Sequence, residues 1–140
     1  MRVLLTLTLA LACTTAFAEP ADTSFLEDYL KGTYTVIGKS LEDTDTYYGE
    51  IALSKSETGL SMTRTITDSV VRGTASIELA TSDQVQVLRI RFREKEHDVE
   101  GTCLIGHDLN NYARLTCHLY HPGTPTRSPG LEAWFIKPPE

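Results

Sequence analysis

The 140-residue chain carries 19 acidic against 13 basic residues, a net charge of −6 at pH 7. Nucleic acids and anionic membrane surfaces recruit concentrated basic faces, so this balance argues against either as a partner. A chain of this length forms one domain and buries roughly two thirds of its unfolded surface, which is enough for a hydrophobic core.

The N-terminus has the pattern of a signal peptide. Arg2 supplies a positive charge, residues 3–12 are mostly apolar, and Ala16-Phe17-Ala18 forms a small-x-small cleavage site. The apolar run is shorter than the roughly 20 residues that a membrane span needs. We therefore predict a signal peptide at residues 1–18 and one mature domain at 19–140. The protein is then periplasmic or secreted, with no transmembrane span.

A second interpretation of the N-terminus involves Cys13. Leu11-Ala12-Cys13 resembles a bacterial lipoprotein cleavage site, at which the cysteine is acylated and becomes the first residue. We favour the signal peptide, because Ala10 stands where lipoproteins usually have a larger aliphatic residue. A lipid anchor through Cys13 is the alternative.

The mature chain opens with one predicted helix and continues as strands. Residues 24–31 (SFLEDYLK) place four apolar or aromatic residues at helical spacing, with Ser24 as N-cap and Gly32 as the stop. Segments rich in β-branched and aromatic residues follow, separated by polar turns. The predicted strands are 33–39, 47–54, 60–67, 71–80, 85–94, 98–106, 112–120 and 131–136.

The short connections determine the predicted fold class. They make neighbouring strands antiparallel, and their regular spacing without a second helix is typical of an up-and-down meander. We predict an all-β protein of about eight strands with one short N-terminal helix. A closed barrel is favoured over a sandwich, because closure removes exposed strand edges.

Residues 101–122 predict a hairpin that contains both cysteines of the mature chain. A turn at 108–111, centred on Asn110, places Cys103 and Cys117 directly opposite each other, within reach of a disulfide. Such a pair is typical of an oxidising compartment. In the chain-entropy model it stabilises the fold by about 3 kcal/mol.

The first two strands resemble a known family. The run 32–39 (GTYTVIGK), followed by Tyr48-Gly49-Glu50-Ile51, resembles the opening of small exported bacterial lipocalin-like proteins. More broadly, the pattern resembles the calycin barrels, which include lipocalins and avidins. The resemblance implies a barrel with a small apolar ligand in its mouth, and it carries over no functional residue. Lipocalins usually have tryptophan in this motif, whereas this chain has Tyr34 and its only tryptophan is Trp134.

Arg64 breaks an otherwise apolar face. It shares one side of its strand with Leu60, Met62 and Ile66, so the alternation directs its guanidinium into the barrel. A buried charge is costly unless it is paired. We favour an ion pair with a carboxylate that closes one barrel end. The alternative is contact with an anionic ligand headgroup inside the barrel.

A second group of arginines lies on a single strand. Arg89, Arg91 and Arg93 form a basic stripe on an acidic protein. We favour a solvated face paired with Glu78 or Glu100 on adjacent strands. The alternative is a docking surface for an acidic partner.

The sequence contains no recognisable catalytic signature. It has no Gly-x-Ser-x-Gly elbow, HExxH or CxxC motif, and His107, His118 and His121 do not converge in the predicted hairpin. We therefore predict no enzyme, no metal and no cofactor.

Two functions remain in balance. The first is an exported, non-enzymatic binding protein that holds a small apolar or amphiphilic ligand in a cavity of a few hundred Å³. The predicted cavity residues are Tyr34, Met62, Arg64, Leu88, Ile90 and Phe92. The alternative is a protein–protein interaction module, such as an exported hydrolase inhibitor, that acts through the loop at 121–130 or the turn at 108–111. A structural envelope protein without a ligand is a third interpretation.

Overall fold

The computed structural model describes residues 22–106 and 112–138. The predicted signal peptide, Cys13, His107 and the predicted turn at 108–111 lie outside these residues. In the part of the chain that is described, no helix is long and apolar enough to cross a membrane.

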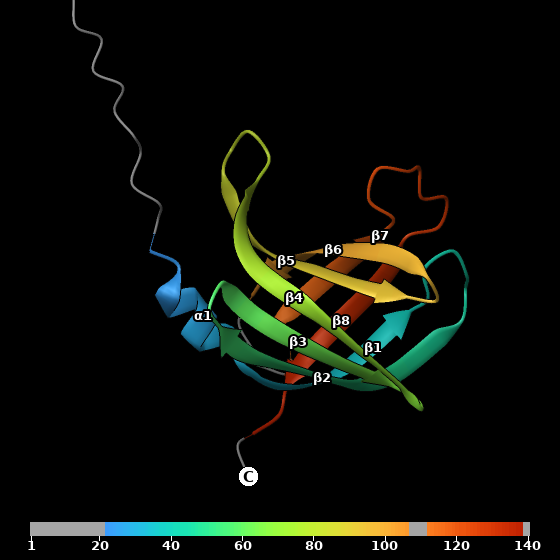
Figure 1. The fold of residues 1–140 in the computed structure, drawn as a ribbon, viewed down its shortest axis with the longest axis horizontal. Coiled ribbons are helices and arrows are strands. Elements are labelled where there is room, and N and C mark those ends of the chain that lie inside the picture. Colours follow the sequence, from blue (N-terminus) through green and yellow to red (C-terminus); the bar gives the residue numbers. More distant parts are fainter. Residues whose placement is uncertain (1–21, 107–111, 139–140) are drawn as a thin grey trace, which may run out of the picture.

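The described chain folds into one short helix and a closed barrel of eight antiparallel strands (Figure 1). The helix is α1 (Ser24–Leu30), and the strands are β1 (Gly32–Lys39), β2 (Thr46–Ser56), β3 (Gly59–Ile66), β4 (Ser69–Ala80), β5 (Val85–Glu94), β6 (His97–Ile105), β7 (Leu115–Tyr120) and β8 (Gly130–Ile136). Each strand pairs with its neighbour in the sequence, and β8 pairs back onto β1. The predicted meander and its closure are confirmed.

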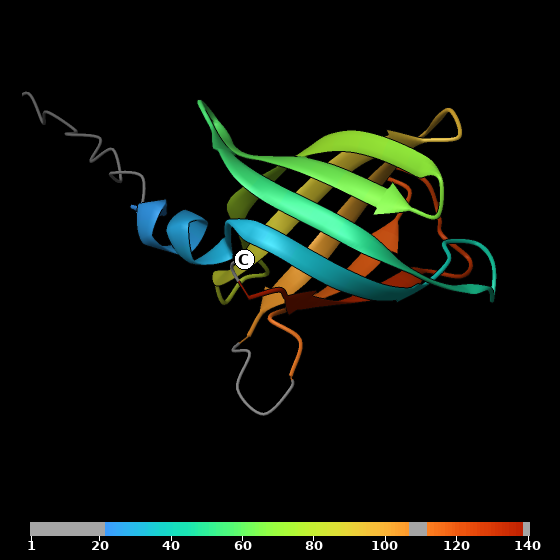
Figure 2. The ribbon, with the colours of Figure 1, turned by 90° about the horizontal axis from the view of Figure 1, so that it is seen from below.

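Helix α1 lies at one end of the barrel (Figure 2). Its N-cap is Thr23 and not the predicted Ser24, and no side chain caps the helix through a hydrogen bond. Leu30 is fully buried, and its carbonyl accepts a hydrogen bond of 2.5 Å from the hydroxyl of Tyr34 on β1. Arg114 also holds the helix, because its Nη1 donates to the carbonyl of Tyr29 at 2.9 Å. The helix therefore closes this end.

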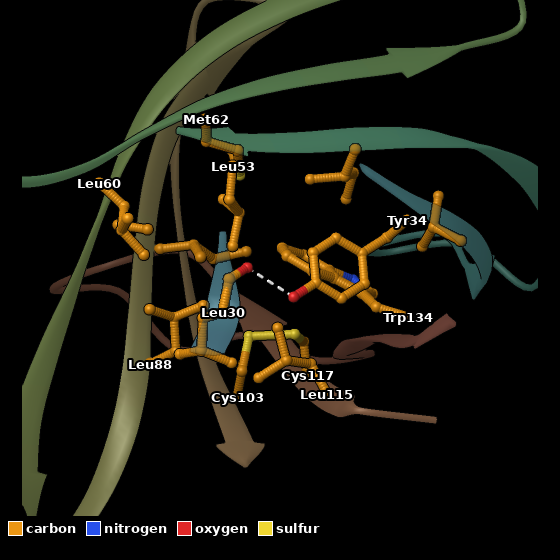
Figure 3. Close-up of a cluster of buried hydrophobic side chains, with 14 of the residues drawn as sticks. Leu30, Tyr34, Leu53, Leu60, Met62, Leu88, Cys103, Leu115, Cys117 and Trp134 are labelled. Atoms are coloured by element: carbon orange, nitrogen blue, oxygen red, sulfur yellow. Dashed lines mark hydrogen bonds between the residues drawn. A yellow bond between two sulfur atoms is a disulfide. The ribbon is translucent and has the colours of Figure 1, made fainter. Parts of the chain in front are cut away.

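Successive side chains of each strand point alternately into and out of the barrel, and the inward ones fill the interior with apolar groups (Figure 3). Cys103 on β6 lies directly opposite Cys117 on β7, and the two form a disulfide inside the core. Trp134 on β8 packs against Tyr34 on the neighbouring β1, with ring centroids 5.8 Å apart. The single tryptophan of the chain therefore packs beside the first strand.

One apolar residue on the inward side of β4 is exposed. Leu79 continues the buried face of β4, yet it is 56% exposed. Here β4 and β5 run on as a hairpin that projects beyond the rest of the barrel (Figure 1). Side chains still alternate between the two faces of this hairpin, but no opposing strand of the barrel covers the inward-facing ones.

Candidate functional site

The barrel has two chemically different ends. In a meander every second connection lies at the same end, so α1 shares its end with the connections β2–β3, β4–β5 and β6–β7. The other end, which we call the mouth, carries the connections at 40–45, 67–68, 95–96 and 121–129. A pocket of about 300 Å³ opens at the mouth.

The pocket combines an apolar wall with a polar rim. Its lining residues come from β2, β3, β5, β6 and β7 and from the adjoining loops: Ser40, Leu41, Glu42, Tyr47, Arg64, Phe92, Glu94, Lys95, His97, Val99, Leu119 and His121. Phe92, Val99 and Leu119 are almost completely buried and form the wall. Lys95 and His97 are exposed, so the polar groups stand toward solvent.

A buried hydrogen-bonded network around Glu132 forms the inner boundary of the pocket. Oε1 of Glu132 accepts a hydrogen bond from the hydroxyl of Tyr47 at 2.5 Å. It also accepts two from Arg64, at 3.2 Å from Nε and 3.0 Å from Nη2. Oε2 accepts one from Nε1 of Trp134 at 2.8 Å. Both carboxylate oxygens are therefore satisfied without water.

Arg64 connects this network to the pocket. Its Nη1 donates to Oε1 of Glu94 at 2.9 Å, and its Nη2 donates to the Tyr47 hydroxyl at 3.0 Å. The guanidinium also lies 5.2 Å from the ring centroids of Tyr47 and Phe92. The Arg64 side chain is 4% exposed and that of Glu94 is 32% exposed, so only Glu94 of this pair faces solvent.

Gly38 explains how three separate strands can form the network. It lies on β1, directly between Tyr47 on β2 and Glu132 on β8. A Cβ at this position would stand 2.5 Å from Cζ of the Tyr47 ring. Because glycine leaves this space open, the tyrosine ring crosses β1 and its hydroxyl reaches the carboxylate.

The charges of the network keep its donors protonated. Burial, together with the neighbouring Glu132 carboxylate, raises the pKa of Tyr47 well above its usual value. Burial is the largest single effect on Arg64 and would lower its pKa, but the combined interactions with Glu132, Tyr47 and Glu94 outweigh it and the pKa is raised. Arg64 thus forms the expected ion pair with a carboxylate, and this pair lies at the inner boundary of the pocket.

The predicted cavity residues divide into two groups. Arg64 and Phe92 line the pocket. The other four, Tyr34, Met62, Leu88 and Ile90, are at most 1% exposed and belong to the packed core. The structure therefore places the pocket at the mouth, beyond the filled centre of the barrel.

Sequence reasoning missed several pocket residues. His97 begins β6 and His121 directly follows the end of β7, and their ring centroids are 5.7 Å apart at the rim. The register of the predicted hairpin could have located His121. If Cys103 lies opposite Cys117, extending the same pairing places Val99 opposite His121. Among the described residues, however, no group of three or more His, Cys, Asp or Glu could hold a metal ion.

The turn at 95–96 holds an unusual backbone at the rim. Lys95 and Glu96 have φ values of 47° and 66°, so both residues of this two-residue hairpin loop are left-handed. Such turns favour Asn and Gly, because side chains with a Cβ are strained there. Strained residues concentrate at functional sites, where other demands outweigh stability.

The long loop after β7 is fixed against the first loop of the mouth. The backbone N–H of Glu42 donates to the carbonyl of Ser128 at 2.8 Å, and Nζ of Lys39 donates to the Ser128 hydroxyl at 3.0 Å. The backbone N–H of Arg127 in turn donates to the Glu42 carboxylate at 3.1 Å. This loop is therefore an ordered part of the mouth.

Two of the three arginines in the stripe, Arg89 and Arg91, pair with carboxylates on neighbouring strands, as expected. Arg91 lies 2.7 Å from Glu78 on β4 and 2.8 Å from Glu100 on β6, and Arg89 contacts the same two carboxylates. The hydrogen bond from Arg91 is the main cause that lowers the pKa of Glu78 to about 2. Arg93 instead donates from Nη2 to the carbonyl of Glu96 at 3.1 Å.

Comparison with protein-family models, curated proteins and solved structures finds no match to this chain. The barrel is compatible with the lipocalin-like resemblance in its strand number and order.

Proposed function

We propose that the protein is an exported, non-enzymatic binding protein that holds a small amphiphilic ligand in the pocket at the mouth of its barrel. The observation that carries this proposal is the pocket itself. Its volume of about 300 Å³ lies at the lower end of the range that small-molecule sites occupy. The opposite end of the barrel is closed by α1, so the mouth is the side on which a ligand enters.

The lining favours an amphiphilic ligand over a purely apolar one. Phe92, Val99 and Leu119 offer an apolar wall, whereas Lys95 and His97 surround the opening with polar groups. The apolar part of a ligand would pack against the wall, and its polar group would stay at the rim. Because Arg64 is already paired with Glu132 and Glu94, the headgroup belongs with the rim residues.

Titration with two fluorescent probes of different charge tests this proposal. We expect N-phenyl-1-naphthylamine, which is neutral, and 1-anilinonaphthalene-8-sulfonate, which is anionic, to bind the mature protein saturably with one site each. Leu41→Trp adds a large ring to a residue that lines the pocket, and it should weaken both probes at least tenfold. Lys95→Glu should weaken the anionic probe more than the neutral one.

Leu79→Trp is the matched control, because it adds the same ring to the hairpin at the opposite end. It should leave both affinities unchanged. Circular dichroism checks that each variant keeps the wild-type strand spectrum. Absence of saturable binding, or equal binding by wild type and a folded Leu41→Trp, would contradict the proposal.

The second candidate is the protein–protein module, for example an exported hydrolase inhibitor that acts through the loop at 121–130. Two observations favour it: the centre of the barrel is filled, and Ser128 and Arg127 fix the loop in one conformation. If neither probe binds, this candidate becomes the stronger one. It would next be tested by pull-down with the loop variant Arg127→Glu as the control bait.

A further inference from the structure

Two histidines stand at inward positions on the rim of the mouth. His97 lies two residues before the buried Val99 of β6, and His121 lies two residues after the buried Leu119 of β7. Because every second side chain of a strand points to the same face, both histidines continue the inward face beyond the core. Both line the mouth pocket. The strand pattern thus brings two imidazole rings together at the opening.

The separation of the two rings is close to that of two ligands on one metal ion. Their centroids lie 5.7 Å apart and their planes are tilted by 60°, so the rings are not stacked. A zinc–nitrogen bond of about 2.0–2.1 Å and a nitrogen roughly 1.2 Å from the ring centre put each centroid about 3.2 Å from a shared ion. At the tetrahedral angle the two centroids are then about 5.2 Å apart. The observed separation is about 0.5 Å longer, and a small rotation of the exposed His97 side chain closes this difference.

A backbone contact holds the ring of His121 in an orientation suited to metal binding. Its Nδ1 lies 3.1 Å from the carbonyl oxygen of Asp98. A carbonyl can only accept, so Nδ1 carries the proton and Nε2 of the neutral ring keeps its lone pair. Histidines that ligate metals almost always donate their other ring N–H to a carbonyl, a carboxylate or water. Within residues 22–106 and 112–138, Nε2 of His121 has no hydrogen-bond partner.

The neighbouring charges limit the protein ligands to these two rings. Glu94 lies directly opposite His97 across the turn at 95–96, but its Oε1 accepts a hydrogen bond of 2.9 Å from Nη1 of Arg64. This agrees with the absence of a three-residue metal group from the described part of the chain. The ionic side chains that line the pocket are Glu42, Glu94, Arg64 and Lys95, two negative and two positive. The lining therefore does not repel a divalent cation through its net charge.

The donor atoms determine the class of ion. Imidazole nitrogens suit zinc, copper and nickel, whereas magnesium and calcium prefer oxygen ligands. Two protein ligands leave at least two positions of a four-coordinate ion to water or to an anionic group. Because both histidines line the pocket, these positions would be open to it.

We infer that His97 and His121 form a two-histidine site for a divalent transition-metal ion of the zinc and copper class at the rim of the mouth. The inference goes beyond the proposed binding of an amphiphilic ligand and does not depend on it, because the two rings bind the ion without that ligand.

Isothermal titration of the mature protein with Zn²⁺ alone tests the inference. The wild type should bind one Zn²⁺ per chain saturably, and it should not bind Mg²⁺ under the same conditions. His97→Asn and His121→Asn each remove one ligand but keep a polar side chain, and each should weaken Zn²⁺ binding at least tenfold. In long-range proton–nitrogen NMR spectra, Zn²⁺ should shift the ring nitrogen signals of His97 and His121 and leave those of His118 unchanged.

His118→Asn is the matched control. His118 is an exposed residue of β7, but it alternates with the buried Cys117 and Leu119 and therefore points to the outer face of the barrel. This variant should bind Zn²⁺ like the wild type, and circular dichroism checks that all three variants keep the wild-type strand spectrum. A wild type without saturable Zn²⁺ binding would overturn the inference. Wild-type affinity in a folded His97→Asn or His121→Asn would overturn it as well, since the ion would then not be shared by the two rings.

Discussion

Arg64 and Glu132 form a buried ion pair whose disruption has a predictable cost. Their side chains are 4% and 0% exposed. Arg64→Met keeps much of the apolar stem but removes the positive charge and two of the four hydrogen bonds onto Glu132. Breaking a buried pair by removing one partner costs about 3–5 kcal/mol, because the other charge stays buried without compensation. We expect a loss of this size at pH 7.

A double variant, Arg64→Met with Glu132→Gln, distinguishes two causes of instability: the unpaired buried charge of Glu132 and the loss of side-chain packing. Glu132→Gln removes the negative charge but keeps an acceptor for Tyr47. Arg64→Met combined with Glu132→Gln should therefore be at least 2 kcal/mol more stable than Arg64→Met alone, which means strong coupling between the two positions.

Urea unfolding followed by far-ultraviolet circular dichroism gives these free energies, with the disulfide intact in every variant. Arg91→Met is the matched control, since Arg91 also pairs with two carboxylates but its side chain is 46% exposed. Its cost should stay within about 1 kcal/mol. If Arg64→Met also costs less than about 1 kcal/mol, or if the double variant is as unstable as the sum of the singles, the account of the network is wrong.

Three further predictions concern stability. Replacing Cys103 and Cys117 together with alanine should cost about 3 kcal/mol yet keep the strand spectrum, and a protein without strand signal at 25 °C would contradict this. Glu96→Gly should raise the unfolding free energy by about 0.5–1 kcal/mol, because glycine relieves the φ of 66°; an unchanged urea midpoint would show that the turn is not strained. Because Arg91 lowers the pKa of Glu78 to about 2, below the usual 4.5, Glu78 stabilises the fold above pH 4.5 and loses this contribution as the pH falls toward 2. Glu78→Gln should cost about 1 kcal/mol at pH 7, after allowance for solvent screening, and should match the wild type near pH 2 in the same urea assay.

Local patterns were sufficient to predict the barrel, the disulfide and the direction of Arg64. Each depends on the alternation of apolar and polar residues or on equal sequence spacing on the two sides of a turn. Cys103 and Cys117, which are equally far from Asn110 in the sequence, do pair. The partner of Arg64 could not be predicted in the same way. The last strand has apolar residues on both faces, with Leu131 and Ala133 outside and Trp134 inside, so its alternation does not show that Glu132 points inward.

The position of the pocket could not be predicted from the sequence either. Whether an eight-stranded barrel is hollow or filled depends on side-chain volumes summed over all strands. Leu30 from the helix and Trp134 from the last strand fill the interior from one end. The pocket at the mouth begins beyond Arg64 and Phe92, which are the two predicted cavity residues that line it.

The most direct test of ligand binding is native mass spectrometry of the protein purified from its native source. The account predicts a small mass bound at one copy per chain, released on denaturation and depleted in Leu41→Trp but not in Leu79→Trp. A wild-type spectrum that contains only the bare polypeptide, from protein that also fails to bind either probe, would contradict it.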